Sequence, residues 1–238
     1  TFGTATIPQV YKIFGPGNQY VTAAKQFAFS KGIAIDLPAG PSELMVVADE
    51  TSVPEFVASD LLSQAEHGAD SQVVCVVNSV QLAERIEEAV NQQVNVLPRK
   101  EIALLALQNS FCVVLNNPEE AIEFINLYAP EHLIIAHKQD DYFIRRIKNA
   151  GSVFLGNYTP ESAGDYASGT NHTLPTNGFA RMYSGVNMDA FVKKITFQRI
   201  TEQGLRNIGG AIEILAQNEE LQAHKNAVTI RLNKMRNK

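Results

Sequence analysis

Apolar residues in this chain form short continuous runs that alternate with longer amphipathic stretches. The short runs are rich in Val, Ile and Leu, which is typical of strands buried on both faces. We expect strands at residues 11–14, 33–36, 44–48, 73–77, 111–115, 132–136 and 152–155. The alternation predicts an α/β fold with a mainly parallel, Rossmann-like sheet covered by helices on both faces.

The amphipathic stretches have helical periodicity. Helices are expected at residues 19–29, 53–67, 80–94, 98–108, 119–128, 140–150, 202–216 and 219–232. The helix at 53–67 is the best marked, because Ser52 and Glu55 have capping-box spacing and Gly68 follows as a stop.

Residues 156–185 break this rhythm. They carry Gly, Asn, Ser, Thr and Pro with few apolar anchors, and they predict a long loop of the kind that usually has a function. A further strand-like run at 194–200 and two helices then predict a separate C-terminal element from about residue 187.

Composition limits the class of protein. The 238 residues are 45% hydrophobic and 19% charged, as in ordinary globular proteins. The net charge of −5, with no basic run longer than Arg145-Arg146, argues against sequence-independent nucleic-acid binding. No membrane partner is expected, because no stretch approaches the roughly 20 apolar residues of a membrane span. The first residues lack a secretory pattern, so the cytoplasm is the expected compartment.

The chain has two cysteines, Cys75 and Cys112, each inside an apolar run. Both are expected to be buried strand thiols without a redox or metal role, because they do not pair at a short spacing.

Several residues could carry chemistry. Gln64 and His67 lie three apart on one helix and can reach a single cation, although a histidine near a helix end is often structural. Glu131 and His132 are a plausible acid/base pair where a strand begins, provided that Glu131 lies before the strand proper, since neighbouring strand residues point to opposite faces.

Other candidates are weaker. The long loop interleaves Glu161, Asp165 and His172 with glycines, which allow close approach to a ligand. The run Gly15-Pro16-Gly17-Asn18 precedes a helix and resembles a phosphate cradle without the full dinucleotide fingerprint. Ser42 lies in a stiff turn and can donate to a ligand or cap, and a lone helical histidine such as His224 is more often a surface residue.

Taken together, these stretches resemble the histidinol dehydrogenase family. The matching runs, in family order, are Gly15-Pro16-Gly17-Asn18, DLPAGPSE at 36–43, ASDLLSQAEHG at 58–68, YAPEHL at 128–133, AGDYASGTNHTLPT at 163–176, Glu219 and Ala223-His224. They span essentially the whole chain.

The resemblance implies oxidation of L-histidinol to L-histidine through L-histidinal, a four-electron reaction of histidine biosynthesis with NAD as hydride acceptor. The implied catalytic residues are His132, which takes the alcohol proton, and Glu131, which activates water. The implied Zn²⁺ ligands are Gln64, His67, Asp165 and His224. The implied substrate-binding residues are these four with Ser42, His132, His172 and Glu219, and Asn18 is implied on the NAD side.

The resemblance also implies a domain organisation. Family members extend further at the N-terminus, so the chain is expected to have an incomplete N-terminal half. Residues 1–41 would end the cofactor-side domain, 42–186 would form the second half of the zinc and substrate domain, and 187–238 would be a dimerisation extension. A homodimer with the site shared across its interface is expected, with poor or no turnover by this chain alone. The alternative is a catalytically silent zinc- or imidazole-binding fragment.

Overall fold

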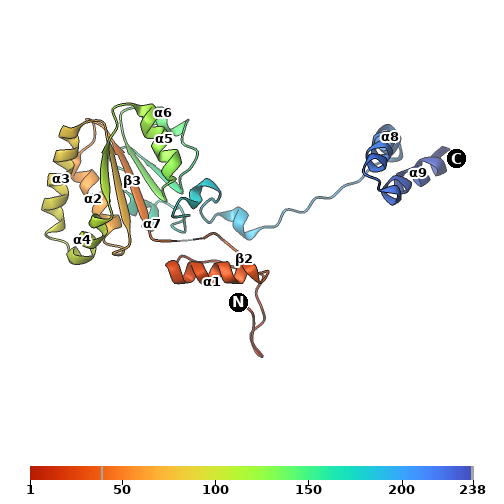
Figure 1. Ribbon diagram of the computed structural model, residues 1–238, viewed down its shortest axis with the longest axis horizontal. Helices are drawn as coiled ribbons and strands as arrows, with labels where there is room; N and C mark the ends of the chain where they lie inside the picture. The colour runs from red at the N-terminus through yellow and green to blue at the C-terminus, as the bar shows by residue number, and fades with distance from the viewer. Residues whose placement is uncertain (39, 237–238) are drawn as a thin grey trace. The chain divides into compact units, whose positions relative to one another are not determined.

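The computed structural model describes residues 1–38 and 40–236 (Figure 1). Its internal contacts divide the chain into two units, Thr1–Val192 and Lys193–Lys238, and each is described by itself. Among the described residues, no helix combines the length and the apolar character that crossing a membrane requires.

A parallel sheet forms the centre of the first unit. Its strands, in sheet order within the described residues, are β5 (Phe111–Val114), β4 (Gln72–Val77), β3 (Glu43–Ala48), β6 (His132–Ala136) and β7 (Ser152–Leu155). Leu44 of the central strand is in register with Val73 on one side and His132 on the other, so β3 and β6 begin side by side. The predicted α/β class and parallel sheet are confirmed.

Helices cover both faces of this sheet (Figure 1). One face carries α2 (Pro54–Ala65), α3 (Val80–Val94) and α4 (Lys100–Gln108), and the other carries α5 (Pro118–Tyr128) and α6 (Asp140–Ile144). Val46 belongs to the first core with Leu61 of α2, whereas Val47 belongs to the second with Ile125 of α5. The strands are apolar throughout because alternate residues serve opposite cores.

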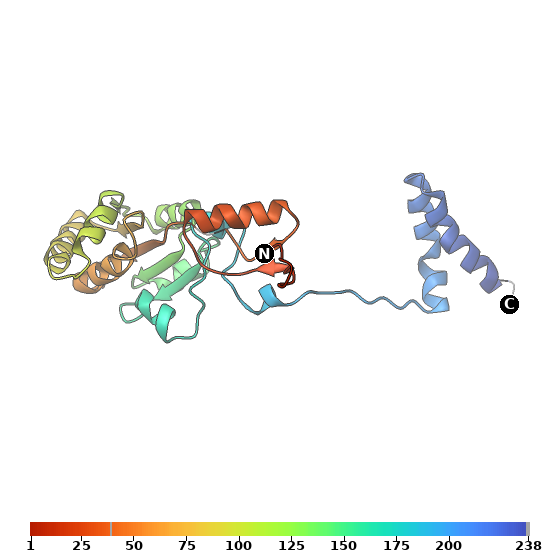
Figure 2. The ribbon, with the colours of Figure 1, turned by 90° about the horizontal axis from the view of Figure 1, so that it is seen from below.

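A smaller motif precedes the sheet (Figure 2). It consists of β1 (Lys12–Ile13), α1 (Gln19–Ser30) and β2 (Ala34–Ile35), with the two short strands parallel. The buried Lys25 ammonium lies 2.7 Å from the Asp36 carboxylate, which connects the helix to the end of β2.

The second unit contains α8 (Glu202–Asn218) and α9 (Gln222–Arg236). Gly209 gives the room in which Leu232 and Val228 of α9 approach α8. The strand expected at 194–200 is wrong, because the structure describes all of these residues and gives them no strand. A strand needs a partner strand for its backbone groups, and none of the described strands pairs with this segment.

Some predicted boundaries also need correction. The expected loop at 156–185 contains α7 (Glu161–Tyr166) and a short 3₁₀ turn, Phe179–Arg181, and a further 3₁₀ turn follows at Met188–Phe191. The helix expected at 140–150 ends at Ile144. The capping box is wrong, since the N-cap of α2 is Val53 and the Ser52 hydroxyl instead donates to the Asp49 carbonyl.

The cysteine prediction is half correct. Cys75 is buried in the core between the sheet and α2 and α3, but Cys112 is exposed. The reason is the position of β5, which pairs with β4 alone among the described strands and so forms an edge of the sheet.

Candidate functional site

A cavity of about 440 Å³ lies where β3 and β6 begin. It collects the site residues of the first unit that the family resemblance implies, except Asn18. The candidates that line it are Ser42, Gln64, His67, Glu131, His132, Asp165 and His172. Its remaining walls are Pro16, Gly17, Gly40, Tyr166, Thr173, Leu174 and Thr176. Segments far apart in the sequence therefore converge on one place.

Glu131 and His132 meet at this cavity. His132 is the first residue of β6 and Glu131 lies just before the strand, which satisfies the condition set by strand geometry. The Glu131 Oε2 lies 3.5 Å from the His132 Nδ1. The same oxygen accepts a hydrogen bond of 2.9 Å from the backbone N–H of Glu43, which fixes the carboxylate at the start of β3.

The His132 imidazole is buried and asymmetric in its contacts. Its Nδ1 lies 3.2 Å from the Glu43 carbonyl oxygen, whereas its Nε2 is buried and has no hydrogen-bond partner among the described residues. Burial lowers the pKa of His132, but the hydrogen bond and charge of Glu131, with the charge of Glu161, raise that pKa to about 9.

Buried carboxyl groups surround this imidazole. The Glu161 Oε1 lies 3.8 Å from the His132 Nδ1, and Glu161 is 1% exposed. Burial raises the pKa of Glu161 to about 8, and the neighbouring Asp165 and Glu131 add to the rise. Burial likewise raises the pKa of Glu43 to about 7.

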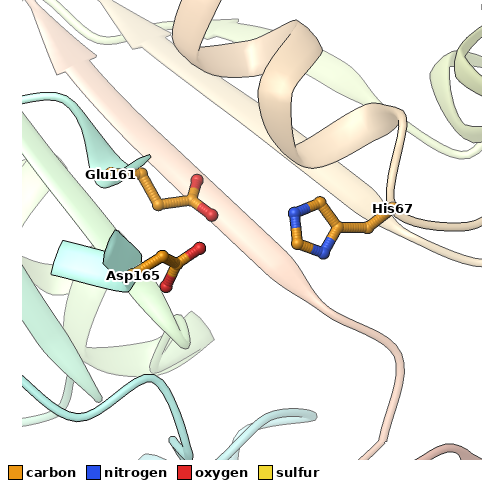
Figure 3. A group of neighbouring side chains, drawn as sticks. All are labelled: His67, Glu161 and Asp165. Carbon is orange, nitrogen blue, oxygen red and sulfur yellow. The ribbon is translucent and has the colours of Figure 1, made fainter. Parts of the chain in front are cut away.

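A potential metal-binding group lies beside the acid/base pair (Figure 3). One ligand atom from each of His67, Glu161 and Asp165 lies within 4.8 Å of the others. Glu161 and Asp165 are four residues apart on α7, so both project to the same side. His67 follows the end of α2 and faces them.

Gln64 adds a neutral oxygen to the same wall of the cavity. Its residue is completely buried, yet neither its amide oxygen nor its amide nitrogen has a hydrogen-bond partner among the described residues. A buried amide without a partner costs about 1–3 kcal/mol, and a ligand in the cavity that binds this amide would offset that cost. One imidazole, carboxylate oxygens and an amide oxygen are a donor set that fits zinc.

Three candidates lie elsewhere. Asn18 is the N-cap of α1, and its Oδ1 accepts the N–H groups of Tyr20 and Val21, so part of the expected phosphate cradle is already used. Glu219 and His224 belong to the second unit, Glu219 at the end of α8 and His224 on α9, and both are exposed.

The comparisons with known proteins show the family of the chain. Residues 1–232 match the family model described as histidinol dehydrogenase. The chain belongs to the histidinol dehydrogenase family.

Individual members of this family are also similar to the chain. It is 58% identical over 235 residues to histidinol dehydrogenase of Bacteroides thetaiotaomicron, covering 99% of this chain and 55% of that protein. It is 57% identical to the chloroplastic enzyme of Arabidopsis thaliana, covering 97% of this chain and 50% of that protein. The crystal structure of histidinol dehydrogenase from Elizabethkingia anophelis matches with a TM-score of 0.96 and 59% identity, covering 99% of this chain and 54% of that one. The chain therefore spans about half the length of these relatives.

Sequence reasoning missed two residues of the site. Glu161 was grouped with its loop but given no part in the metal site, although its i, i+4 spacing from Asp165 was readable had the segment been recognised as a helix. Glu43 was seen only as part of a turn, and its backbone N–H and carbonyl both hold the acid/base pair.

Proposed function

We propose that this chain provides the zinc and substrate site, and the acid/base pair, for the NAD-linked oxidation of L-histidinol to L-histidine. The observation that supports the proposal is that the Glu131–His132 pair and the His67–Asp165 group line the same cavity. Family membership names the reaction, and the cavity offers the residues that the reaction needs.

The metal would be held by Gln64, His67 and Asp165, with His224 as the fourth ligand on the family pattern. Zinc, when bound, supplies a Lewis-acidic centre that fixes the amine and imidazole nitrogens of the substrate. Glu161 belongs to the same group of side chains and would be a fifth polar contact available to the metal. Ser42 and His172 line the cavity and would bind the rest of the substrate, as would Glu219 on the family pattern.

His132 would act as the base for the alcohol proton. Its Nδ1–H is held by the Glu43 carbonyl, so the neutral ring keeps its lone pair on Nε2, the nitrogen without a partner. Proton removal requires this neutral form, and the adjacent Glu131 charge then stabilises the imidazolium that results. The ring is thus oriented through Nδ1 and accepts the proton at Nε2.

Glu131 would serve the second oxidation by accepting a proton from the water that adds to the aldehyde. The carboxylate is fixed at one oxygen by the Glu43 N–H, which leaves the other oxygen for water. NAD⁺, when bound, supplies the hydride acceptor for both oxidations. Asn18 would contribute to that side through its amide nitrogen, because its oxygen caps α1.

Two copies of the chain would complete one site. The family pattern places the C-terminal extension of one copy, with His224 and Glu219, at the zinc site of the other. Sedimentation and metal analysis of His224→Ala test this directly: we expect an unchanged oligomeric state with reduced zinc content, and a full zinc content would contradict it.

The decisive experiment compares the variant His132→Asn with the same substitution at His137, five residues further along the chain. His137 pairs with Asp49, with 3.6 Å between Nε2 and Oδ2, and lies outside the cavity, so His137→Asn is the matched control. The assays are NADH absorbance with L-histidinol and zinc, and zinc content. We expect both variants to retain zinc, and we expect only His132→Asn to lose the low NADH formation that this chain is expected to give on its own. If the wild type binds zinc and histidinol but forms no NADH, the silent-fragment alternative is supported. If His132→Asn forms as much NADH as the wild type, the proposal is contradicted.

A further inference from the structure

Cys75 and Cys112 lie opposite one another on neighbouring strands, and neither lines the cavity of the proposed reaction. They are the only cysteines of the chain, 37 positions apart, and the β4–β5 register pairs them directly. Neighbouring strands lie roughly 4.8 Å apart, which falls inside the range of about 4.4–6.8 Å between the Cα atoms of a disulfide. Their side chains leave the sheet on the same face, because partners in a parallel register do so.

The two thiols differ in access to solvent. Cys75 is 4% exposed and belongs to the core under α2 and α3, whereas Cys112 is exposed on the edge strand. A second cavity of about 370 Å³ is lined by both cysteines and by apolar side chains such as Ile86 and Val90 of α3. A small molecule can therefore reach Cys112 first and still lie next to Cys75.

The two thiols also differ in how readily they lose a proton. A hydrogen bond with Cys75 lowers the pKa of Cys112, although burial and the charge of Glu87 oppose this. The pKa of Cys75 is raised by the same hydrogen bond and by burial. The thiolate, which is the nucleophile in disulfide exchange, thus forms on the accessible cysteine.

We propose that Cys75 and Cys112 form a dithiol site that reacts with low-molecular-weight disulfides, with Cys112 as the attacking thiol and Cys75 as the resolving thiol. The Cys112 thiolate attacks one sulfur of the reagent, breaks its S–S bond and releases one thiolate, which takes a proton from solvent. The Cys75 thiol then loses its proton, attacks the Cys112 sulfur of the mixed disulfide and releases the second thiol. The two protein thiols are oxidised to a disulfide while the reagent is reduced to two thiols.

The test uses oxidised glutathione with the native chain, followed by intact-mass and peptide mass spectrometry. The wild type is compared with Cys75→Ala and Cys112→Ala, each checked for folding by circular dichroism, and Cys75→Val fills the core if the alanine variant does not fold. We expect the wild type to give a peptide that links positions 75 and 112 and to retain no glutathione.

The variants separate the two roles. Cys75→Ala should stop at a stable glutathione adduct on Cys112, because the resolving thiol is gone. Cys112→Ala should react at least about tenfold more slowly, because Cys75 is buried and protonated. A stable glutathione adduct on the wild type, equal rates for the two variants, or a native wild type that does not react would each overturn the proposal.

Discussion

The Glu131 Oε2 lies 3.5 Å from the His132 Nδ1 although the two residues are consecutive in the chain. Within a strand their side chains would point apart, but β6 begins only at His132. The preceding helix, α5, ends at Tyr128, and its C-cap Ala129 adopts the left-handed conformation, with φ of 58°, so the chain turns there. This turn makes an adjacent pair usable as one acid/base unit.

The Glu131 charge controls the protonation of His132. Since this charge helps to raise the pKa of His132, activity that needs the neutral imidazole should increase with pH. Glu131→Gln should move this increase to lower pH and slow the aldehyde oxidation by about 10²–10⁴-fold. NADH formation measured against pH with L-histidinol and L-histidinal separately tests both effects, with the exposed Glu50→Gln as control. An unchanged pH profile would show that Glu131 does not set the protonation of the ring.

The stability of the metal-free chain should decrease as pH rises through neutrality. The Glu161 pKa is about 8 in the folded chain against an ordinary value of 4.5, so the folded state holds a proton that the unfolded state has lost. The resulting stability is fully present below pH 4.5 and is lost as pH rises through about 8. The raised pKa of His132 acts in the same direction between 6.5 and about 9.

Urea unfolding with a chelator at pH 5 and pH 8 measures this dependence. Glu161→Gln should flatten it by on the order of 1 kcal/mol or more, because the replacement does not ionise. Glu50→Gln should leave it unchanged, since the Glu50 pKa is lowered to about 2 and lies outside the window. Equal slopes in wild type and Glu161→Gln would rule out this linkage.

The sheet was predictable from sequence because its signal is local. The strands at 44–48 and 73–77 are continuous apolar runs, and the structure extends each by one residue at its start. The identity of the edge strand depends on the order of the strands in the sheet, and a local sequence pattern does not reveal that order. The exposure of Cys112 and its register with Cys75 were therefore not accessible to periodicity.

The sequence predicted which residues belong to the site better than it predicted how they are arranged. The family runs identified Gln64, His67 and Asp165, and the structure brings these to one cavity. Glu161 remained unassigned because α7 is six residues long and contains glycine, so its sequence favours a loop. Gly164 lets this helix pack closely against the Phe154 ring, because a Cβ there would lie 2.7 Å from a ring carbon, and such tertiary packing contributes more to helix stability than propensity does.

Zinc affinity should distinguish the members of the metal group. Asp165→Asn and His67→Ala each remove a proposed ligand and should leave the purified chain with little zinc. Glu161→Gln should weaken affinity by about 10–100-fold if Glu161 orients the ligands without binding the ion. Competition with a fluorescent chelator measures all three, and Glu55→Gln on the exposed start of α2 is the control. Wild-type affinity in Asp165→Asn would exclude this group as the zinc site.

Gln64 should show opposite effects on stability and on binding. Its buried amide has no partner among the described residues, so Gln64→Met, which keeps the volume, should leave the metal-free chain equally stable or stabilise it by about 1–3 kcal/mol. The same change removes a proposed zinc ligand and should reduce zinc content. Urea unfolding with a chelator and metal analysis of the same sample test the pair. A large loss of stability would show that the amide is satisfied without a ligand.

Gly151 should be intolerant of a side chain because it supports the acid/base pair. A Cβ at this position would lie 2.5 Å from the Glu131 carbonyl oxygen, which is backbone and cannot move aside without shifting Glu131. Gly151→Ala should therefore destabilise the chain by about 1–3 kcal/mol and reduce turnover through the displaced carboxylate. Gly210 is the matched control, because a Cβ there meets no described atom within 4 Å and Gly210→Ala should stabilise α8 by about 0.5–1 kcal/mol. Urea unfolding measures the stability of both variants, and NADH formation measures their turnover. Full turnover in Gly151→Ala would show that the position of Glu131 tolerates displacement.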